Sequence, residues 1–304
     1  MQRVNEGDAG GPTLFARLGI LFGLFFIMLI AVSATVLLIG KLDLSPRTEG
    51  LTVALFQNLL VFILPALIYA RVISHTPFKA LTLSNSMDCR QIIGVILAFV
   101  IGLPFLNQII LWNESFTFPS SMSGLEQLFR EMENNAQKAT GILLSTSSIG
   151  GLISGVLIVG VITGFGEELF FRGGIQKAMT DSGVNHHLAI WLTAILFSTL
   201  HFQFYGFIPR VILGAFFGYL LFWSDSIWVS TTAHALNNSI VVITAWIANR
   251  GGEAFDVERY GVTENGFPWI ALASCILLFL LIAYGKRFFF ENNNFRYRPL
   301  KRNL

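Results

Sequence analysis

The sequence predicts an all-α, polytopic membrane protein, folded as a bundle of about eight transmembrane helices. Of its 304 residues, 54% are hydrophobic and only 12% are charged, whereas soluble domains carry about 25% charged residues. The mean hydropathy is +0.65. The 28 glycines are typical of membrane helices that pack closely against one another.

Eight apolar runs approach the ~20 residues that a helix needs to cross a bilayer. They lie at 16–40, 51–73, 91–112, 144–166, 187–205, 207–223, 226–248 and 267–288. We expect the fourth run to continue as a helix to about residue 178. The longest loop, 113–143, contains SGLEQLFREMENNAQK, and its pattern predicts a short amphipathic helix on the surface.

The positions of Lys and Arg predict the orientation, because short cytoplasmic loops are enriched in both. If both termini are cytoplasmic, 13 of the 20 Lys and Arg residues, Arg172 among them, fall on the cytoplasmic side. The acidic loops at 113–143 and 249–266 then lie outside. The basic C-terminal segment GKRFFFENNNFRYRPLKRNL is the strongest marker. We therefore predict a multi-pass protein of the cell membrane, with the lipid bilayer as its surroundings.

Other classes of protein find little support in the composition. The net charge is +2, and no tract mixes basic and aromatic residues, so no nucleic-acid partner is expected. The two cysteines, Cys89 and Cys275, lie far apart, which predicts neither a disulfide framework nor a thiolate metal site. No oligomeric state follows from the sequence.

A few ionisable side chains interrupt the apolar runs, at a cost of ~2.5–3.5 kcal/mol each at a helix centre. Glu168 and Arg172 stand four residues apart, which places them on one helical face as an ion pair. Glu167 lies about 100° around that helix, so it is free to act as a general base. The alternative is a buried ion-pair network that only fixes helix packing.

Two further motifs supply imidazoles. His201 follows Phe197 by four residues, so the two rings share a face, and His234 and Asn238 share a face in the same way. The latter pair could donate hydrogen bonds to a developing oxyanion, or it could join two helices. At ~1.5 Å per residue, Glu167 and the other three residues lie ~12–21 Å from the ends of their helices, which favours one shared site.

Small residues predict close helix contacts around this site. Gly160 and Gly164 form one small-xxx-small pair, and Gly214 and Gly218 form another. Gly164 and Gly166 also flank the approach to Glu167, where they could leave room for water or for a peptide backbone.

Three motifs in this order resemble those of a known family. EELFFRG, FSTLH and HALNN are similar to the EExxxR, FxxxH and HxxxN motifs of the CAAX-protease and bacteriocin-processing (CPBP, or Abi) intramembrane proteases. The resemblance covers roughly residues 145–250. It divides the chain into N-terminal spans and an extracytoplasmic loop (1–143), a protease core (144–250) and a last span with a basic tail (251–304).

The resemblance implies proteolysis of a peptide or membrane-anchored protein within the bilayer. By motif position, Glu167 would activate water with His201, while His234 and Asn238 would stabilise the oxyanion. Glu168 and Arg172 would hold the first motif in shape. Eukaryotic members cut isoprenylated CAAX proteins, and bacterial members are linked to peptide maturation or bacteriocin self-immunity.

Two questions stay open at this point. Members of the family are commonly described as metalloproteases, and Glu167, His201 and His234 could form a His₂Glu zinc site with one open position. The chain lacks the HExxH motif, so a glutamate mechanism without metal is favoured over one Zn²⁺. The alternative function is a non-catalytic bacteriocin-immunity or membrane scaffold protein. A proton relay or transporter is less favoured, because no paired discontinuous helices suggest inverted repeats.

Overall fold

The computed structural model describes residues 12–251, 257 and 259–291. Within these ranges the chain forms only helices, turns and loops, with no strand, so the predicted all-α class is confirmed. The outermost N-terminal residues and most of the predicted basic tail lie outside the described residues.

The first half of the bundle contains three long helical segments and one surface helix. Its elements are α1 (Leu14–Ile39), α2 (Pro46–Gln57) continued by η1 (Asn58–Ile63) and α3 (Leu64–Ile73), α4 (Pro77–Ala80), α5 (Cys89–Glu114), η2 (Ser120–Met122) and α6 (Ser123–Leu144).

The second half begins with one long helix made of five consecutive segments. These are α7 (Ile149–Gly155), η3 (Val156–Ile162), α8 (Thr163–Glu168), η4 (Leu169–Gln176) and α9 (Lys177–Asp181). They are followed by α10 (His186–Thr199), η5 (Phe204–Gly206), α11 (Phe207–Ser224), α12 (Ile227–Asn249), α13 (Trp269–Leu280), η6 (Leu281–Gly285) and α14 (Lys286–Phe289).

The sequence sets where several of these helices begin. Asp88 and Gln91 form a capping box at the start of α5, in which each side chain bonds the backbone N–H of the other residue. Ser45 caps α2 just before Pro46, which suits the first turn because it has no N–H to satisfy. The side chain of Ser148 caps the long helix that starts at Ile149.

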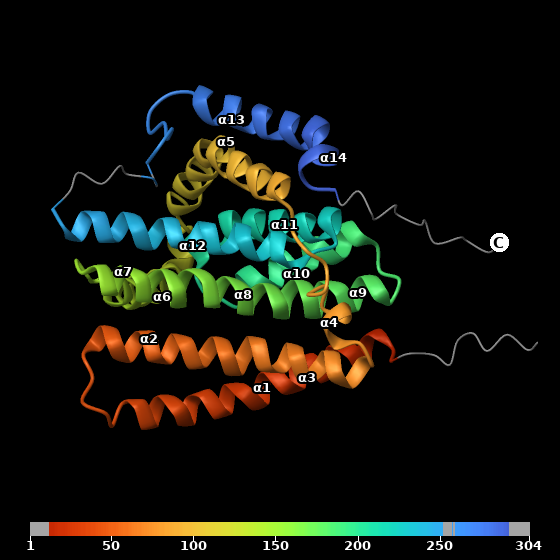
Figure 1. The fold of residues 1–304 in the computed structure, drawn as a ribbon. Coiled ribbons are helices and arrows are strands. Elements are labelled where there is room, and N and C mark those ends of the chain that lie inside the picture. The colour runs from red at the N-terminus through yellow and green to blue at the C-terminus, as the bar shows by residue number, and fades with distance from the viewer. Residues whose placement is uncertain (1–11, 252–256, 258, 292–304) are drawn as a thin grey trace, which may run out of the picture.

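The helices form layers around the second half of the chain. In Figure 1, α1 and the α2–α3 segment form one outer layer, α7–α9 and α12 lie inside, and α13 packs with α5 on the opposite side. The first described helix begins and the last one ends at the same end of the bundle (Figure 1). This arrangement agrees with termini on one side of a membrane, and which side that is stays a prediction.

Six helices among the described residues are long and apolar enough to cross a membrane. They start at Leu14, Pro46, Cys89, Ile149, Phe204 and Trp269. Many of their large apolar side chains point outward, among them Ile30 (73% exposed) and Leu37 (72% exposed), as lipid-facing residues would. The chain is therefore a multi-pass membrane bundle.

The remaining two of the eight predicted spans are α10 and α12. α10 has 14 residues and is only ~21 Å long, shorter than a ~30 Å hydrocarbon core. α12 has 23 residues but carries several polar side chains and is not among the six. The count of eight therefore stays a prediction.

The helix that carries both glutamates runs without a break from Ile149 to Asp181, which confirms the predicted continuation to about residue 178. Two of its segments, η3 and η4, are π-helical and flank the short α8 at Glu167 and Glu168. Such π-helical insertions often occur at functional sites. The sequence pattern gave no sign of either insertion.

Glycines bring α12 and α11 close to this helix. A Cβ at Gly160 would overlap the side-chain oxygen of Ser239, and a Cβ at Gly164 would lie 2.9 Å from the backbone nitrogen of Ala235. The predicted packing role is thereby confirmed. The expectation that Gly164 and Gly166 leave room for water or a peptide is wrong, because α12 and the α2–η1 segment fill that space.

Replacement of Gly164 by Ala is expected to destabilise the bundle by about 1–3 kcal/mol, because the added methyl group meets backbone rather than a flexible side chain. The matched control is Gly150→Ala on the same helix, where a Cβ would meet nothing within 4 Å. Unfolding by SDS titration in mixed micelles measures both variants. Equal stability of the two would contradict the close contact between α8 and α12.

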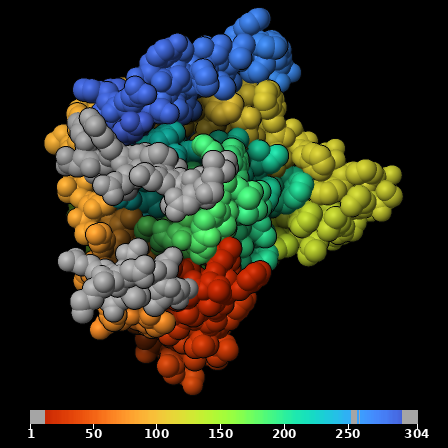
Figure 2. All heavy atoms as spheres, turned by 90° about the vertical axis from the view of Figure 1, so that its right-hand side faces the viewer, coloured from red at the N-terminus to blue at the C-terminus, as the bar shows by residue number. Residues whose placement is uncertain are grey.

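The predicted surface helix is confirmed and is longer than expected, since α6 spans 22 residues. Figure 2 shows the α6 region as a lobe that projects from the bundle. Aromatic side chains attach this lobe to the segment that follows His201. The Phe129 ring stacks on Phe204 at 4.9 Å between centroids, and Phe118 contacts Phe204 at 5.0 Å.

Candidate active site

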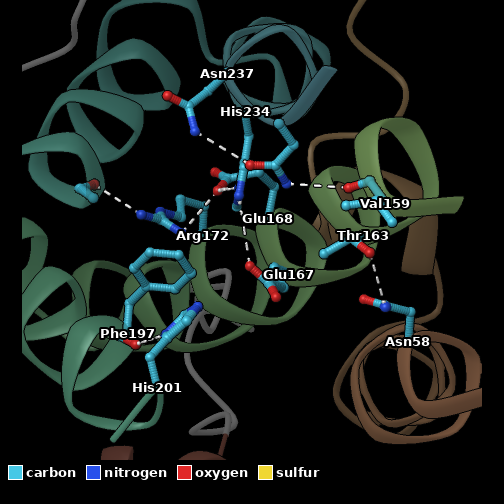
Figure 3. Close-up of polar contacts among 12 residues, drawn as sticks. Asn58, Val159, Thr163, Glu167, Glu168, Arg172, Phe197, His201, His234 and Asn237 are labelled. Atoms are coloured by element: carbon cyan, nitrogen blue, oxygen red, sulfur yellow. Dashed lines mark hydrogen bonds and ion pairs between the residues drawn. The ribbon is translucent and has the colours of Figure 1, made fainter. Parts of the chain in front are cut away.

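Two adjacent carboxylates lie at the end of α8, inside the bundle. Glu168 is completely buried, and its Oε1 atom accepts a hydrogen bond from Arg172 Nη1 at 2.8 Å. The ion pair predicted from the four-residue spacing is therefore confirmed. The same Oε1 atom also accepts a hydrogen bond from His234 Nδ1 at 2.9 Å, so Glu168 is not engaged by Arg172 alone (Figure 3).

Arg172 is held on several sides and is fully buried, so it is not one of the loop charges that the orientation prediction counted. Its Nη2 atom donates to the backbone oxygen of Gly214 at 2.8 Å. Its guanidinium carbon lies 4.7 Å from the centre of the Phe197 ring and 5.6 Å from that of Phe217, within the range of cation–π attraction. A buried ion pair is tolerated only with such additional partners.

His234 connects the two carboxylates. Its Nε2 atom lies 3.6 Å from Glu167 Oε2, while its Nδ1 atom bonds Glu168 as described above. Because the Arg172-paired carboxylate of Glu168 accepts this bond, Nδ1 carries the proton and, in a neutral ring, Nε2 presents its lone pair to Glu167. The imidazole stacks on Phe217 with 4.9 Å between ring centres, which fixes its plane.

His201 lies just beyond the end of α10. Its Nδ1 atom donates to the backbone oxygen of Phe197 at 2.7 Å, so Nε2 is left as the acceptor of a neutral ring. Phe202, the next residue, has φ 54°, a left-handed conformation that turns the chain toward η5. Phe197 lies between the two imidazoles, with ring-centre distances of 4.8 Å to His201 and 5.8 Å to His234.

Asn238 has different partners from those predicted. Its Nδ2 atom donates to the backbone oxygen of Val159 at 3.2 Å, and its Oδ1 atom accepts from Asn237 at 3.2 Å. These contacts match the alternative interpretation, a hydrogen bond between helices. In this structure the amide does not bond His234 or Glu167.

The predicted zinc ligands do not form a metal site in this arrangement. Among the described residues, no group of three or more His, Cys, Asp or Glu side chains is arranged to hold a metal ion. His234 gives Nδ1 to Glu168 and keeps the Nε2 lone pair, as a metal-bound histidine also does, so the donor types alone would suit zinc. It is the arrangement of Glu167, His201 and His234 that does not form a His₂Glu site here.

Several neighbours of the site were not predicted from the sequence. Phe217 and the Gly214 carbonyl come from α11, which carries none of the three motifs. Asn58, on η1, donates to Thr163 at the start of α8 with an Nδ2–Oγ1 distance of 3.0 Å. The sequence did hold one indication of these neighbours. A buried arginine has five N–H donors, so Arg172 needs further acceptors besides the Glu168 carboxylate.

Together, a buried carboxylate pair, an arginine and two imidazoles converge from three helices inside an apolar bundle (Figure 3). This combination defines a polar site among apolar helices, and ionisable side chains in that setting are candidates for a functional role. Residues 149–240 match the family model for type II CAAX prenyl endopeptidase, Rce1-like. This matched segment, less than a third of the chain, contains all three motifs, so their resemblance to the CPBP peptidases is confirmed over residues 149–240. No curated protein matches the chain.

Proposed function

We propose that this protein is an intramembrane endopeptidase that hydrolyses a peptide bond by glutamate-activated water. The observation that carries the proposal is the buried contact of His234 with both glutamates, 3.6 Å to Glu167 and 2.9 Å to Glu168. It lies within the segment that matches a peptidase family. A polar cluster that only held helices together would not need the second carboxylate, Glu167, which lies beside the His234 imidazole without a hydrogen bond to a described residue.

In the proposed reaction, Glu167 removes a proton from a water molecule that His201 Nε2 orients. The water oxygen attacks the carbonyl carbon of the substrate, and the carbonyl oxygen becomes an oxyanion. His234 can share the transferred proton through Nε2, because the Glu168 carboxylate stabilises the resulting imidazolium. The imidazolium donates to the oxyanion. The C–N bond then breaks, and the proton passes to the leaving nitrogen.

Arg172 and Glu168 act through His234 in this scheme. Arg172 holds Glu168 in place, and Glu168 orients the imidazole. Asn238 can donate to the oxyanion only if its amide turns away from the Val159 carbonyl. We therefore assign it a smaller part in oxyanion stabilisation than His234.

The substrate class that we propose is a peptide or protein held at the membrane by a lipid. The matching family model is described as a CAAX prenyl endopeptidase. A lipid anchor would also deliver a peptide bond to a polar site inside apolar helices. We therefore use a farnesylated CAAX peptide as the first probe.

The test is cleavage of that internally quenched peptide by the purified protein in nanodiscs made with H₂¹⁸O. Hydrolysis at the site places one ¹⁸O atom in the new carboxylate, which mass spectrometry of the products detects. The Glu167→Gln variant is run beside the wild type. A non-catalytic immunity or scaffold protein would give no product above that variant, and this result would overturn the proposal.

We also propose that the reaction needs no metal, because the described His and Glu side chains do not cluster as ligands. Turnover is expected to stay unchanged after dialysis against 1,10-phenanthroline, with the structurally inert 1,7 isomer as control. Loss of activity with the 1,10 isomer alone, followed by recovery on addition of Zn²⁺, would contradict this expectation.

A further inference from the structure

A second polar cluster lies between α6 and α11, outside the three motifs. It consists of Glu133, Gln203, Tyr205 and Arg210, and we refer to it as the α6–α11 cluster. Gln203 joins the two helices, because its Nε2 atom donates to Glu133 Oε1 at 3.0 Å and its Oε1 atom accepts from Arg210 Nη2 at 2.9 Å.

Three polar atoms of this cluster are buried without a hydrogen-bond partner among the described residues. They are Glu133 Oε2, the Tyr205 hydroxyl and Arg210 Nη1. A buried polar group left unpaired destabilises the fold, and a charged group does so more strongly. The cluster therefore holds one unused acceptor and one unused donor, and Gln203, rather than a direct ion pair, links Glu133 to Arg210.

Helix packing places Arg210 beside the candidate active site. Arg172 Nη2 donates to the Gly214 carbonyl at 2.8 Å, and four residues further along both helices Gln176 Nε2 donates to the Gly218 carbonyl at 3.0 Å. One four-residue step in the other direction brings Arg210 to the level of the paired carboxylates at the end of α8.

The surroundings fix the cluster in this position. Gln203 follows His201 by only two residues. The Arg210 guanidinium packs over Gly206, where a Cβ would lie 3.0 Å from Nη2.

Aromatic contacts also hold α6, the helix that carries Glu133, in place. Arg130, one turn before Glu133 on α6, lies over the Tyr205 ring at 4.4 Å. The lobe seen in Figure 2 is thus tied to the segment that carries His201.

We propose that the α6–α11 cluster binds the main chain of the substrate peptide next to the bond that is cut, with Arg210 Nη1 donating to a peptide carbonyl and Glu133 Oε2 accepting from a peptide N–H. A peptide main chain offers both a C=O acceptor and an N–H donor, the two kinds of partner that Arg210 Nη1 and Glu133 Oε2 lack. This inference rests on the proposed function for the class of ligand, a peptide. It adds α6 to the substrate-binding surface.

The test measures binding of a fluorescent farnesylated CAAX peptide to the protein in nanodiscs by anisotropy. Glu133→Gln and Arg210→Met are each expected to raise Kd about 10–100-fold, because each removes a hydrogen bond to a charged group. The control is Glu131→Gln on the exposed side of α6, where Glu131 accepts a hydrogen bond from Gln127 and no other described residue bonds its side chain. It should bind like the wild type.

Ester substitution in the probe separates main-chain binding from a structural role. Peptides in which one N–H near the cleaved bond is replaced by an ester oxygen lose the donor to Glu133. At one position, the ester should weaken binding to the wild type and have no further effect in Glu133→Gln. If every ester weakens both proteins equally, or if the variants bind as the wild type does, the proposal is overturned.

The outcome for this cluster is distinguishable from the outcome for the catalytic proposal. If Glu167→Gln binds the probe normally but does not cut it, while Glu133→Gln binds weakly, both proposals stand. If the cluster variants bind normally and Glu167→Gln is inactive, only the cluster proposal falls. If Glu167→Gln still cuts and the cluster variants bind weakly, only the catalytic proposal falls. A wild type that does not bind the probe overturns main-chain binding by the cluster.

Discussion

Glu167→Gln is expected to lower kcat for peptide cleavage by about 10²–10⁴-fold, the contribution of a positioned general base. The substitution keeps the size of the side chain and removes only its ability to take a proton. Among the described residues, the Glu167 side chain accepts no hydrogen bond, and its Oε2 atom lies 3.6 Å from His234 Nε2. The amide can therefore occupy the same space, and KM should change little.

The measurement compares initial rates of the wild type and Glu167→Gln on the farnesylated peptide, together with unfolding in mixed micelles. The unfolding curves should coincide, because this carboxylate makes no hydrogen bond to any other described residue. Undiminished turnover in Glu167→Gln would show that the base is another residue. Loss of activity together with loss of folding would place Glu167 in the packing of the helices rather than in the chemistry.

The sequence was sufficient for the helices and for the ion pair, because both depend on local spacing. The apolar runs correspond to helices since only helices satisfy the backbone in lipid. The four-residue spacing of Glu168 and Arg172 correctly predicted their contact. The grouping of the motifs into one site followed from their similar distances to the helix ends.

The site contacts between different helices depend on how the helices pack, and no local sequence pattern predicts that packing. The second bond of Arg172 goes to a backbone oxygen of α11, 42 residues away. The interpretation that Glu168 belongs to Arg172 alone missed His234, because the relative rotation of α8 and α12 follows from the Gly164 contact. Arg210 was missed for a similar reason, since its place beside the site depends on the register of α11 against the long helix.

Glu168→Ala is expected to destabilise the protein by about 3–5 kcal/mol, because it leaves the Arg172 charge buried without its counterion. Both side chains are 0% exposed, so neither water nor lipid can compensate. The matched control is Asp181→Ala on the same helix. Asp181 forms an ion pair of the same spacing with Lys177 at 3.1 Å, but both side chains are partly exposed. Its loss should cost less than about 1 kcal/mol.

The double variant Glu168→Leu/Arg172→Met then separates stability from chemistry. Removal of both charges eliminates the unpaired ion, so most of the free energy of unfolding lost in Glu168→Ala should return. Activity should not return, because His234 has lost the carboxylate that orients its Nδ1 atom and stabilises its imidazolium. SDS titration and peptide cleavage are measured on the same preparations. A double variant that is stable and fully active would show that the ion pair only supports the fold, and that His234 does not depend on Glu168.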